Sequence, residues 1–456
     1  MKRKKLFIFT VLMAILSLLS GFAADKPNIL ILFADDLGYG DVGFNGCRDI
    51  PTPNIDSLAK NGTIFNNGYV TCAVCGPSRA GLLSGRYQNR LGFEDNPGPF
   101  RQTKETKPGF PVEQKTIADR MKALGYTTGM VGKQHDGVGP EFNPINRGFD
   151  EFFGFNNGAS DYFKPSKLVR GLNPIQMKED YITDAFGNEA SDFVRRHADE
   201  PFFLYVAFNA PHGPLHAKDE HLEKFKSIKD VTRRKYVSMV HSMDENIGKI
   251  LSELRENDLE DNTLIFFLSD NGGPKNIKAN NGELRGQKGE LYDGGIHVPY
   301  VVQWKGTLPA GQTIEHPVIS LDILPTAVAA GGGKVSKDWK LDGVSLLPQL
   351  TGKNVKAPHD ALCWRFLFQH GFRTADWKLV KVKEKNGGKV RDWQLFRISD
   401  DPSEKNDVID QYPEVAKKLQ KRYDSWTAEL PEPQWGWQPA FCGKIRIDSK
   451  SPDRDW

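Results

Sequence analysis

The amino-acid sequence predicts an α/β fold in which helices cover both faces of a mostly parallel central sheet. Two features of residues 28–350 support this prediction: continuous apolar runs of strand length, and helical segments that alternate with them. The runs expected to form strands are 29–33, 127–131, 202–208, 264–268 and 298–304. The segments expected to form helices are 54–60, 115–124, 233–255 and 321–330.

The chain after about residue 356 has a different pattern. Short apolar runs predict a small antiparallel sheet, and a longer helical segment follows them; the runs are 361–368, 377–383 and 393–398, and the helix is 414–429. A chain of 456 residues also exceeds what one compact core usually supports. We therefore expect an N-terminal catalytic domain over residues 25–355 and a C-terminal subdomain over residues 356–456.

The first 24 residues have the pattern of a secretory signal peptide. Four basic residues at positions 2–5 precede an apolar stretch over 6–19, and small residues follow. The apolar stretch is too short, and too promptly followed by polar chain, to favour a membrane span. We therefore expect an exported protein, periplasmic or secreted, that has no stable membrane anchor.

The charge of the chain gives no reason to expect a nucleic-acid partner. The formal charge is +3, and because four basic residues and no acidic residue lie within positions 1–23, removing that segment leaves −1. A chain so close to neutrality lacks the basic excess that binds phosphate backbones.

Five cysteines are too few for a disulfide scaffold in a chain of this length. One of them, Cys75, precedes Gly76-Pro77-Ser78-Arg79 and an Ala/Leu run that predicts a helix opening just after it. Cys75 is expected at a helix N-terminus, which favours an anion, or else in a disulfide or a Cys-x-x-Cys redox pair. The other four allow at most two bridges, whose pairing stays open: Cys47, Cys72, Cys363 and Cys442.

Oxygen-bearing side chains follow two of the expected strands. Asp35 and Asp36 end the first strand, and Asp270 and Asn271 follow the strand over 264–268. Because the carboxyl ends of parallel strands meet at one edge of a sheet, these side chains would suit a hard cation such as Ca²⁺. Each pair taken alone is also common turn chemistry.

The string Cys75-Gly76-Pro77-Ser78-Arg79, continued to Leu83-Ser84-Gly85-Arg86, resembles the signature of type I sulfatases, members of the alkaline-phosphatase-like superfamily. The resemblance implies that a sulfatase-maturating enzyme oxidises Cys75 to formylglycine (3-oxoalanine), whose hydrate is the nucleophile. It also implies one Ca²⁺ held by residue 75 and by the carboxylate and amide side chains of Asp35, Asp36, Asp270 and Asn271. Ser84 departs from the more usual threonine but keeps the hydroxyl.

Three further segments carry the same resemblance: Gly132-Lys133-Gln134-His135, Ala210-Pro211-His212 and the segment from Lys288 to Pro299. By that resemblance, Arg79, Lys133 and Lys288 bind the sulfate, and Asp270 takes a proton from the nucleophile. His212, with Lys288, protonates the leaving alcohol, and His135 acts as the later base. Gln134, Asp136, Asp293 and His297 depart from the usual residues, and neither Asp293 nor His297 receives a catalytic role.

The resemblance covers nearly the whole mature chain and implies an exported bacterial sulfatase acting on sulfated carbohydrates. Export, the Trp and Tyr content and two polar segments, 156–167 and 365–370, favour that substrate class. The residues expected to contact sugar are Asp161, His216, Arg365 and His370. Two alternatives remain open: a phosphate-ester or phosphonate hydrolase of the same superfamily, and a non-catalytic sulfated-glycan-binding protein.

Overall fold

The computed structural model describes residues 26–98, 108–137, 139–382 and 391–435. The signal-peptide prediction and Cys442 lie outside these residues. In the described part of the chain, no helix combines the length and the apolar character needed to cross a bilayer.

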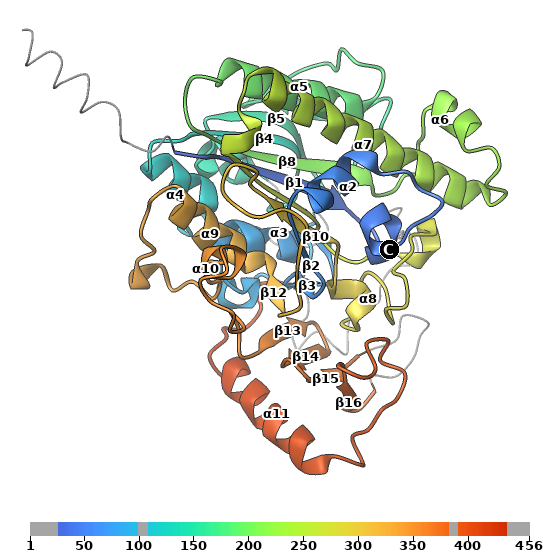
Figure 1. The fold of residues 1–456 in the computed structure, drawn as a ribbon, viewed down its shortest axis with the longest axis vertical. Coiled ribbons are helices and arrows are strands. Elements are labelled where there is room, and N and C mark those ends of the chain that lie inside the picture. The colour runs from blue at the N-terminus through green and yellow to red at the C-terminus, as the bar shows by residue number, and fades with distance from the viewer. Residues whose placement is uncertain (1–25, 99–107, 138, 383–390, 436–456) are drawn as a thin grey trace, which may run out of the picture.

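A ten-stranded mixed sheet forms the centre of the molecule (Figure 1). Its strand order is β11-β2-β10-β9-β1-β8-β4-β5-β6-β7. The central strands β9, β1, β8, β4 and β5 run parallel, whereas β10, β6 and β7 pair antiparallel with their neighbours. The bounds are β1 Asn28–Asp35, β2 Thr63–Phe65, β4 Thr127–Gln134, β5 Glu151–Asn156, β6 Leu168–Arg170, β7 Asn173–Pro174, β8 Phe202–Pro211, β9 Thr263–Ser269, β10 Tyr300–Gln303 and β11 Gln312–Ile314.

Helices cover both faces of this sheet, as Figure 1 shows. One face packs against α2 (Pro53–Lys60), α5 (Ile182–Arg196) and α7 (Val231–Glu256), and the other against α3 (Cys75–Ser84), α4 (Ile117–Ala123) and α9 (Ile323–Ala330). Every residue of β1, β8 and β9 is buried, which is why these strands read as continuous apolar runs. The remaining short elements are α6 Asp219–Lys224, α8 Asp293–Ile296, α10 Leu347–Leu350, β3 Gly68–Tyr69 and β12 Val318–Ile319.

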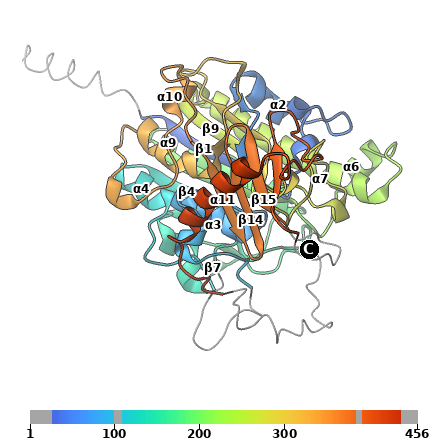
Figure 2. The same ribbon diagram turned by 90° about the horizontal axis from the view of Figure 1, so that it is seen from below.

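A four-stranded antiparallel sheet follows, and α11 (Pro413–Thr427) packs on it (Figure 2). Its strands are β13 Leu362–Phe366, β14 Gln369–Arg373, β15 Trp377–Lys381 and β16 Gln394–Arg397. An apolar core joins this small sheet to the part of the chain that precedes residue 356. In this core, Trp364 and Leu379 share one buried cluster with Tyr69, Tyr292 and Leu321. The domain boundary expected at residues 355 and 356 stays a prediction.

The expected strands and helices are present, with ends that differ by a few residues. Several elements were not predicted: the strands β2, β3, β5, β6, β7, β11 and β12, and the helices α5, α6, α8 and α10. Helix α5 lies in a segment where polar residues interrupt the apolar pattern. The run expected over 361–368 corresponds to β13 alone, and β14, which begins at Gln369, was not predicted either. A turn at Leu367, whose φ is +54°, reverses the chain there, so residues 365–370 form a hairpin and not a polar insert.

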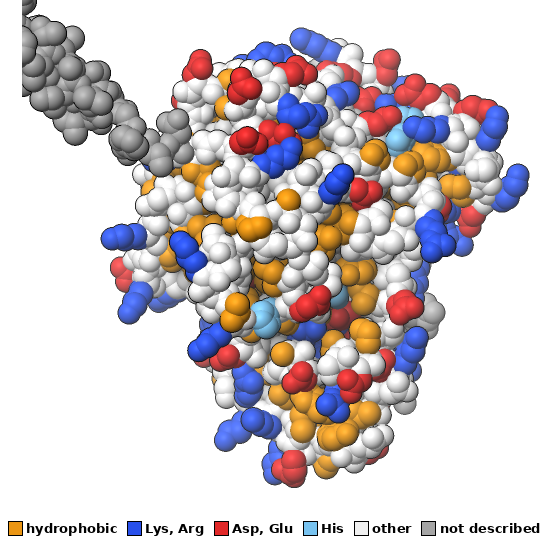
Figure 3. All heavy atoms as spheres, viewed as in Figure 1, with side chains coloured by type: hydrophobic (Ala, Val, Ile, Leu, Met, Phe, Trp, Pro, Cys, Tyr) orange, Lys and Arg blue, Asp and Glu red, His pale blue; other side chains and the backbone are white. Residues whose placement is uncertain are grey.

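Charged side chains of both signs are interspersed on the face drawn in Figure 3. Lys and Arg side chains lie next to Asp and Glu side chains over most of that face, with apolar side chains between them. That face therefore carries no large patch of a single sign.

Candidate active site

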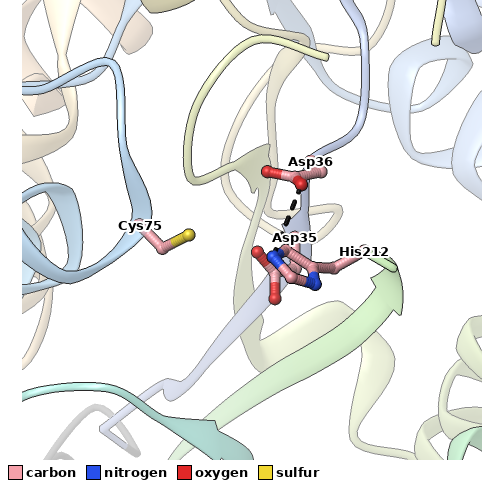
Figure 4. Close-up of side chains that lie close together, drawn as sticks. All are labelled: Asp35, Asp36, Cys75 and His212. Atoms are coloured by element: carbon pink, nitrogen blue, oxygen red, sulfur yellow. Dashed lines mark ion pairs between the residues drawn. The ribbon is translucent and has the colours of Figure 1, made fainter. Parts of the chain in front are cut away.

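Four side chains from separate parts of the chain meet at the carboxyl edge of the large sheet (Figure 4). Asp35 and Asp36 come from the end of β1, Cys75 from the start of α3 and His212 from the residue after β8. One potential ligand atom of each lies within 4.8 Å of those of the others. They meet because β8 and β9 both pair with β1 in parallel, so the three strands end at the same edge.

Asp270 and Asn271 lie against the two aspartates of this group. We call the following four residues the acidic cluster: Asp35, Asp36, Asp270 and Asn271. The Oδ1 atom of Asp270 accepts a hydrogen bond of 3.1 Å from the backbone N–H of Asp36. The amide of Asn271 donates to Asp36 Oδ1 at 2.7 Å. Asp36 adopts a left-handed backbone with φ of +68°, a conformation that costs a non-glycine residue energy and is found mainly at functional sites.

The acidic cluster fits a hard cation. The Oδ1 atoms of Asp35 and Asn271 are buried and have no hydrogen-bond partner among the described residues. Burial and the neighbouring Asp35 carboxylate raise the pKa of Asp270 to about 7. A cation at the cluster would satisfy the two oxygen atoms and relieve this repulsion, and carboxylate and amide oxygens are the ligands that Ca²⁺ prefers.

Three buried cations surround the acidic cluster. The Nζ atom of Lys133 lies 2.5 Å from Asp35 Oδ2, and Arg79 Nη2 lies 2.9 Å from Asp270 Oδ2. Lys288 Nζ lies 2.7 Å from Asp36 Oδ1. All three side chains are at most 5 % exposed. Fixed, desolvated positive charges of this kind stabilise a multivalent oxyanion strongly, because little solvent screens them.

Cys75 faces this group of charges, and its Sγ atom is directed from α3 towards the carboxylates in Figure 4. Lys288 Nζ lies 3.2 Å from Sγ. Burial opposes ionisation of the thiol, but the ammonium groups of Lys133 and Lys288 outweigh it and lower its pKa to about 6. Residue 75 therefore occupies a position that favours negative charge.

The helix begins at Cys75 itself and not after it, so Pro77 is its third residue. Proline is tolerated there because the N–H groups of a first helical turn have no partner within the helix. The N–H of Gly76 instead donates to Asn96 Oδ1 at 2.8 Å. Sequence reasoning missed Asn96, because no local signal marks a residue that caps the helix from 20 positions away.

The two histidines of the site have opposite protonation tendencies. Burial disfavours the charged form of His212, but Asp35 and Asp36 outweigh it and raise the pKa of this residue. Its Nε2 lies 3.6 Å from Asp36 Oδ2, and its Nδ1 contacts the carbonyl of Gly213 at 2.6 Å. Burial, followed by the charges of Lys133 and Arg79, lowers the pKa of His135 well below its usual value. Near neutral pH, His212 thus favours holding a proton and His135 favours a free lone pair.

Tyr162 supports the backbone beside His212. Its hydroxyl lies 2.6 Å from the carbonyl oxygen of Asn209 and 2.8 Å from that of His212. The side chain is fully buried. Sequence reasoning missed this residue, because its role depends on a contact across 50 positions of the chain.

The four expected sugar contacts separate into two places. Asp161 and His216 pair at 3.3 Å in partly exposed positions, and His216 follows His212 in the same loop. Arg365 and His370 lie on β13 and β14 and line a separate cavity of about 560 Å³. There Arg365 Nε donates to Glu94 Oε1 at 2.7 Å, and His370 Nδ1 contacts the Tyr423 hydroxyl at 2.6 Å.

The residues that depart from the usual motif have structural partners. The Ser84 hydroxyl donates to the Ala80 carbonyl at 2.7 Å and lies 3.2 Å from the Arg86 N–H, so it closes the end of α3. Asp293 is buried beside Lys378 Nζ at 2.5 Å, and His297 Nε2 contacts the carbonyl of Asn66 at 2.7 Å. Asp293 thus connects α8 to β15 of the small sheet, His297 packs beside it, and neither belongs to the acidic cluster.

None of the described cysteines, at positions 47, 72, 75 and 363, is in a disulfide with another described residue. Cys72 and Cys363 are buried, and burial raises the pKa of each thiol above its usual range. The charges that lower the pKa of Cys75 therefore distinguish it from these two cysteines.

Comparison with known proteins identifies two family models. The model described as Sulfatase matches residues 27–333, and the model described as N-sulphoglucosamine sulphohydrolase, C-terminal, matches residues 286–429. Among relatives, N-acetylgalactosamine-6-sulfatase of Mus musculus is 34% identical over 374 residues, covering 76% of this chain and 71% of its own. The uncharacterized sulfatase YdeN of Escherichia coli K12 is 34% identical over 404 residues, covering 76% and 70%.

Solved structures show the same fold over nearly the whole chain. Ps i-CgsB in complex with k-i-k-neocarrahexaose has a TM-score of 0.84 and 37% identity, covering 94% of this chain and 98% of that one. The PsFucS1 sulfatase from Pseudoalteromonas sp. has a TM-score of 0.78 and 26% identity, covering 94% and 95%. The chain therefore belongs to the sulfatase family of sulfuric ester hydrolases, within the alkaline-phosphatase-like superfamily.

Proposed function

We propose that this sulfatase hydrolyses sulfate esters of carbohydrates, using a formylglycine formed from Cys75 and one Ca²⁺ at the acidic cluster. The observation that carries the proposal is the position of residue 75. Its side chain meets Asp35, Asp36 and His212 within 4.8 Å, with Lys288 3.2 Å away. A sugar substrate is supported by the likeness to Ps i-CgsB, whose structure contains k-i-k-neocarrahexaose.

The ligands proposed for Ca²⁺ are the four residues of the acidic cluster and residue 75. When present, the cation would neutralise charge on the sulfate, and the hydrated aldehyde would supply a nucleophilic oxygen that the thiol lacks. The two buried oxygens without hydrogen-bond partners, on Asp35 and Asn271, support this assignment.

Arg79, Lys133 and Lys288 are proposed to bind the sulfate oxygens. Each is buried and held by a carboxylate of the acidic cluster, so each is already oriented before substrate arrives. Groups fixed in this way need little reorganisation as charge develops, which is the main source of electrostatic catalysis.

Proton transfer is assigned to three side chains. His212 would donate from Nε2 to the departing sugar oxygen, since Asp35 and Asp36 favour its protonated form. Asp270, a member of the acidic cluster that residue 75 faces, would accept the proton of the nucleophile. His135, neutral because of burial and the nearby cations, would act as a base in regenerating the site.

The carbohydrate is proposed to contact two places. The Asp161–His216 pair lies in and beside the loop that carries His212, so it is suited to the sugar unit bearing the sulfate. The cavity lined by Arg365, His370, Lys381 and Trp393 is suited to a neighbouring sugar unit, because an aromatic ring and polar side chains of both charges line it.

This function requires export and maturation of the chain. We therefore infer that residues 1–24 direct it to the periplasm or outside the cell, and that a sulfatase-maturating enzyme converts Cys75. The segment 1–24 lies outside the described residues, so its signal-peptide pattern is the support for export.

Two measurements test the proposal: mass spectrometry of the peptide that contains Cys75, and assays of activity on sulfate and phosphate monoesters. Conversion to formylglycine lowers the mass of that peptide, and protein with more of the converted form should turn over more sulfated sugar. Parallel assays on sulfate and phosphate monoesters separate a sulfatase from a phosphoesterase. Full activity in protein whose Cys75 is entirely unconverted would refute the proposed nucleophile.

A further inference from the structure

A second cluster of metal-binding side chain types lies away from the acidic cluster, between α6 and α7. The loop that carries His212 leads directly into α6, which packs against α7 (Figure 1). Helix α6 supplies His221, and α7 supplies His241 and Glu245, with one potential ligand atom from each lying within 4.8 Å of the others. The side chain of His221 contacts Glu245 on α7.

The spacing on α7 explains how two of these side chains converge. His241 and Glu245 are four residues apart, so they lie one helical turn apart on the same face. Glu245 places one carboxylate oxygen 3.2 Å from His241 Nε2 and the other 3.1 Å from His221 Nε2. A tetrahedral Zn²⁺ with bonds of about 2.0–2.1 Å separates its ligand atoms by about 3.3 Å. Both separations, each to a different oxygen of Glu245, are close to that value, so a small rotation of the carboxylate would bring one ion within reach of all three side chains.

Hydrogen bonds fix where the lone pair of His241 points. Its Nδ1 faces the carbonyl oxygen of Pro51 at 3.3 Å, and that oxygen can only accept a hydrogen bond. Nδ1 therefore carries the proton, and the lone pair is on Nε2, where the ammonium of Lys224 donates to it at 2.7 Å. The ammonium of Lys224 thus occupies the lone-pair side of His241, the side from which a metal would bind.

Lys224 is able to leave this position. It is the last residue of α6 and is exposed, whereas the side chains of His221 and His241 are each only 6 % exposed. The Nδ1 atom of His221 has no hydrogen-bond partner among the described residues, so this buried ring is not held by an alternative network on that side. Rotation of one exposed lysine would open the site without moving the buried imidazoles.

We propose that His221, His241 and Glu245 bind a divalent transition-metal ion, with Zn²⁺ as the best match, when Lys224 swings out. Two imidazoles and one carboxylate suit Zn²⁺ and are poor ligands for Ca²⁺, which prefers oxygen. The ion would tie α6 to α7 and so restrain the preceding loop, which carries His212 and His216. The proposal does not depend on the sulfatase reaction.

Zn²⁺ binding, measured by competition with a chromophoric chelator in excess Ca²⁺, tests the proposal. Excess Ca²⁺ occupies the acidic cluster, and any Zn²⁺ that Cys75 and His212 still bind there is common to the wild type and the variants below, so that the comparison isolates the cluster of α6 and α7. Wild-type protein should bind one equivalent of Zn²⁺ that His241→Gln loses, and Glu245→Gln, at a partly exposed residue, should weaken it at least about 10-fold. Lys224→Met should tighten Zn²⁺ binding, because it removes the competing ammonium.

Co²⁺ provides a second measurement that reports geometry. Bound at this cluster it should give the intense visible absorption of a four-coordinate ion, which Zn²⁺ displaces and which His221→Gln abolishes. Circular dichroism of each variant establishes that it is folded. Equal Zn²⁺ binding by wild type, His241→Gln and Glu245→Gln would overturn the proposal, as would unchanged or weaker binding by Lys224→Met.

Discussion

Replacing His212 by alanine tests the assignment of the general acid most directly. A sugar alkoxide is a poor leaving group that needs a proton as its bond to sulfur breaks, whereas a nitrophenolate leaves without one. General acid assistance is worth about 100- to 10,000-fold, or about 3–5 kcal/mol of transition-state stabilisation. His212→Ala should therefore lower kcat/KM by that factor on a sulfated sugar and by much less on an activated aryl sulfate.

The structure also sets the expected pH dependence. Because Asp35 and Asp36 raise the pKa of His212, its proton is retained through its ordinary titration range and is lost only as pH rises through the elevated value. The rate on a sulfated sugar should thus fall on the alkaline side in wild type. That decline should be absent in His212→Ala, because the titrating group is gone.

The assay compares kcat/KM on a defined sulfated sugar and on nitrophenyl sulfate, across pH, for the wild type and three variants. His212→Gln is the matched control, since it keeps a hydrogen-bond donor but has no proton to transfer. Lys288→Ala is the second control and should depress both substrates, because Lys288 is assigned to the sulfate itself. An equal loss on both substrates in His212→Ala would show that the histidine positions sulfate and would refute the general-acid assignment.

Three further outcomes are expected. Cys75→Ala should fold normally, as judged by its melting temperature, and show no turnover; substantial residual rate would contradict the formylglycine assignment. Exhaustive chelation should lower both the melting temperature and the activity, and Ca²⁺ should restore them; indifference to chelation would contradict the metal assigned to the acidic cluster. Lys378→Met should lower the free energy of unfolding by about 3–5 kcal/mol in urea titrations, since it leaves Asp293 and Glu404 buried without their cation; a change below 1 kcal/mol would refute that reasoning.

The local patterns in the chain were sufficient to predict the central strands and the residues at their ends. Apolar runs marked β1 and β9, and the polar residues that follow them, from Asp35 and from Asp270, were predicted to share an edge. This succeeded because burial on both faces leaves an unbroken apolar run, and because parallel strands necessarily end on the same side. The cysteine signature then predicted the sulfatase family, which the comparisons confirm.

Contacts between distant parts of the chain could not be predicted in this way. The hairpin over residues 365–370 depends on one left-handed residue, Leu367, and the cluster of His221, His241 and Glu245 depends on how α6 packs against α7.

The sequence by itself thus predicted the strands that carry the motifs, the place of Cys75 at a helix N-terminus and the chemical types of the residues proposed for the site. Only the tertiary structure decided that Asp36 and Asp270, 234 positions apart, share a hydrogen bond, and that Arg365 pairs with Glu94. The physical reason is that periodicity and turn chemistry are properties of neighbouring residues. The pairing register and the packing of helices, in contrast, are set by burial summed over the whole chain.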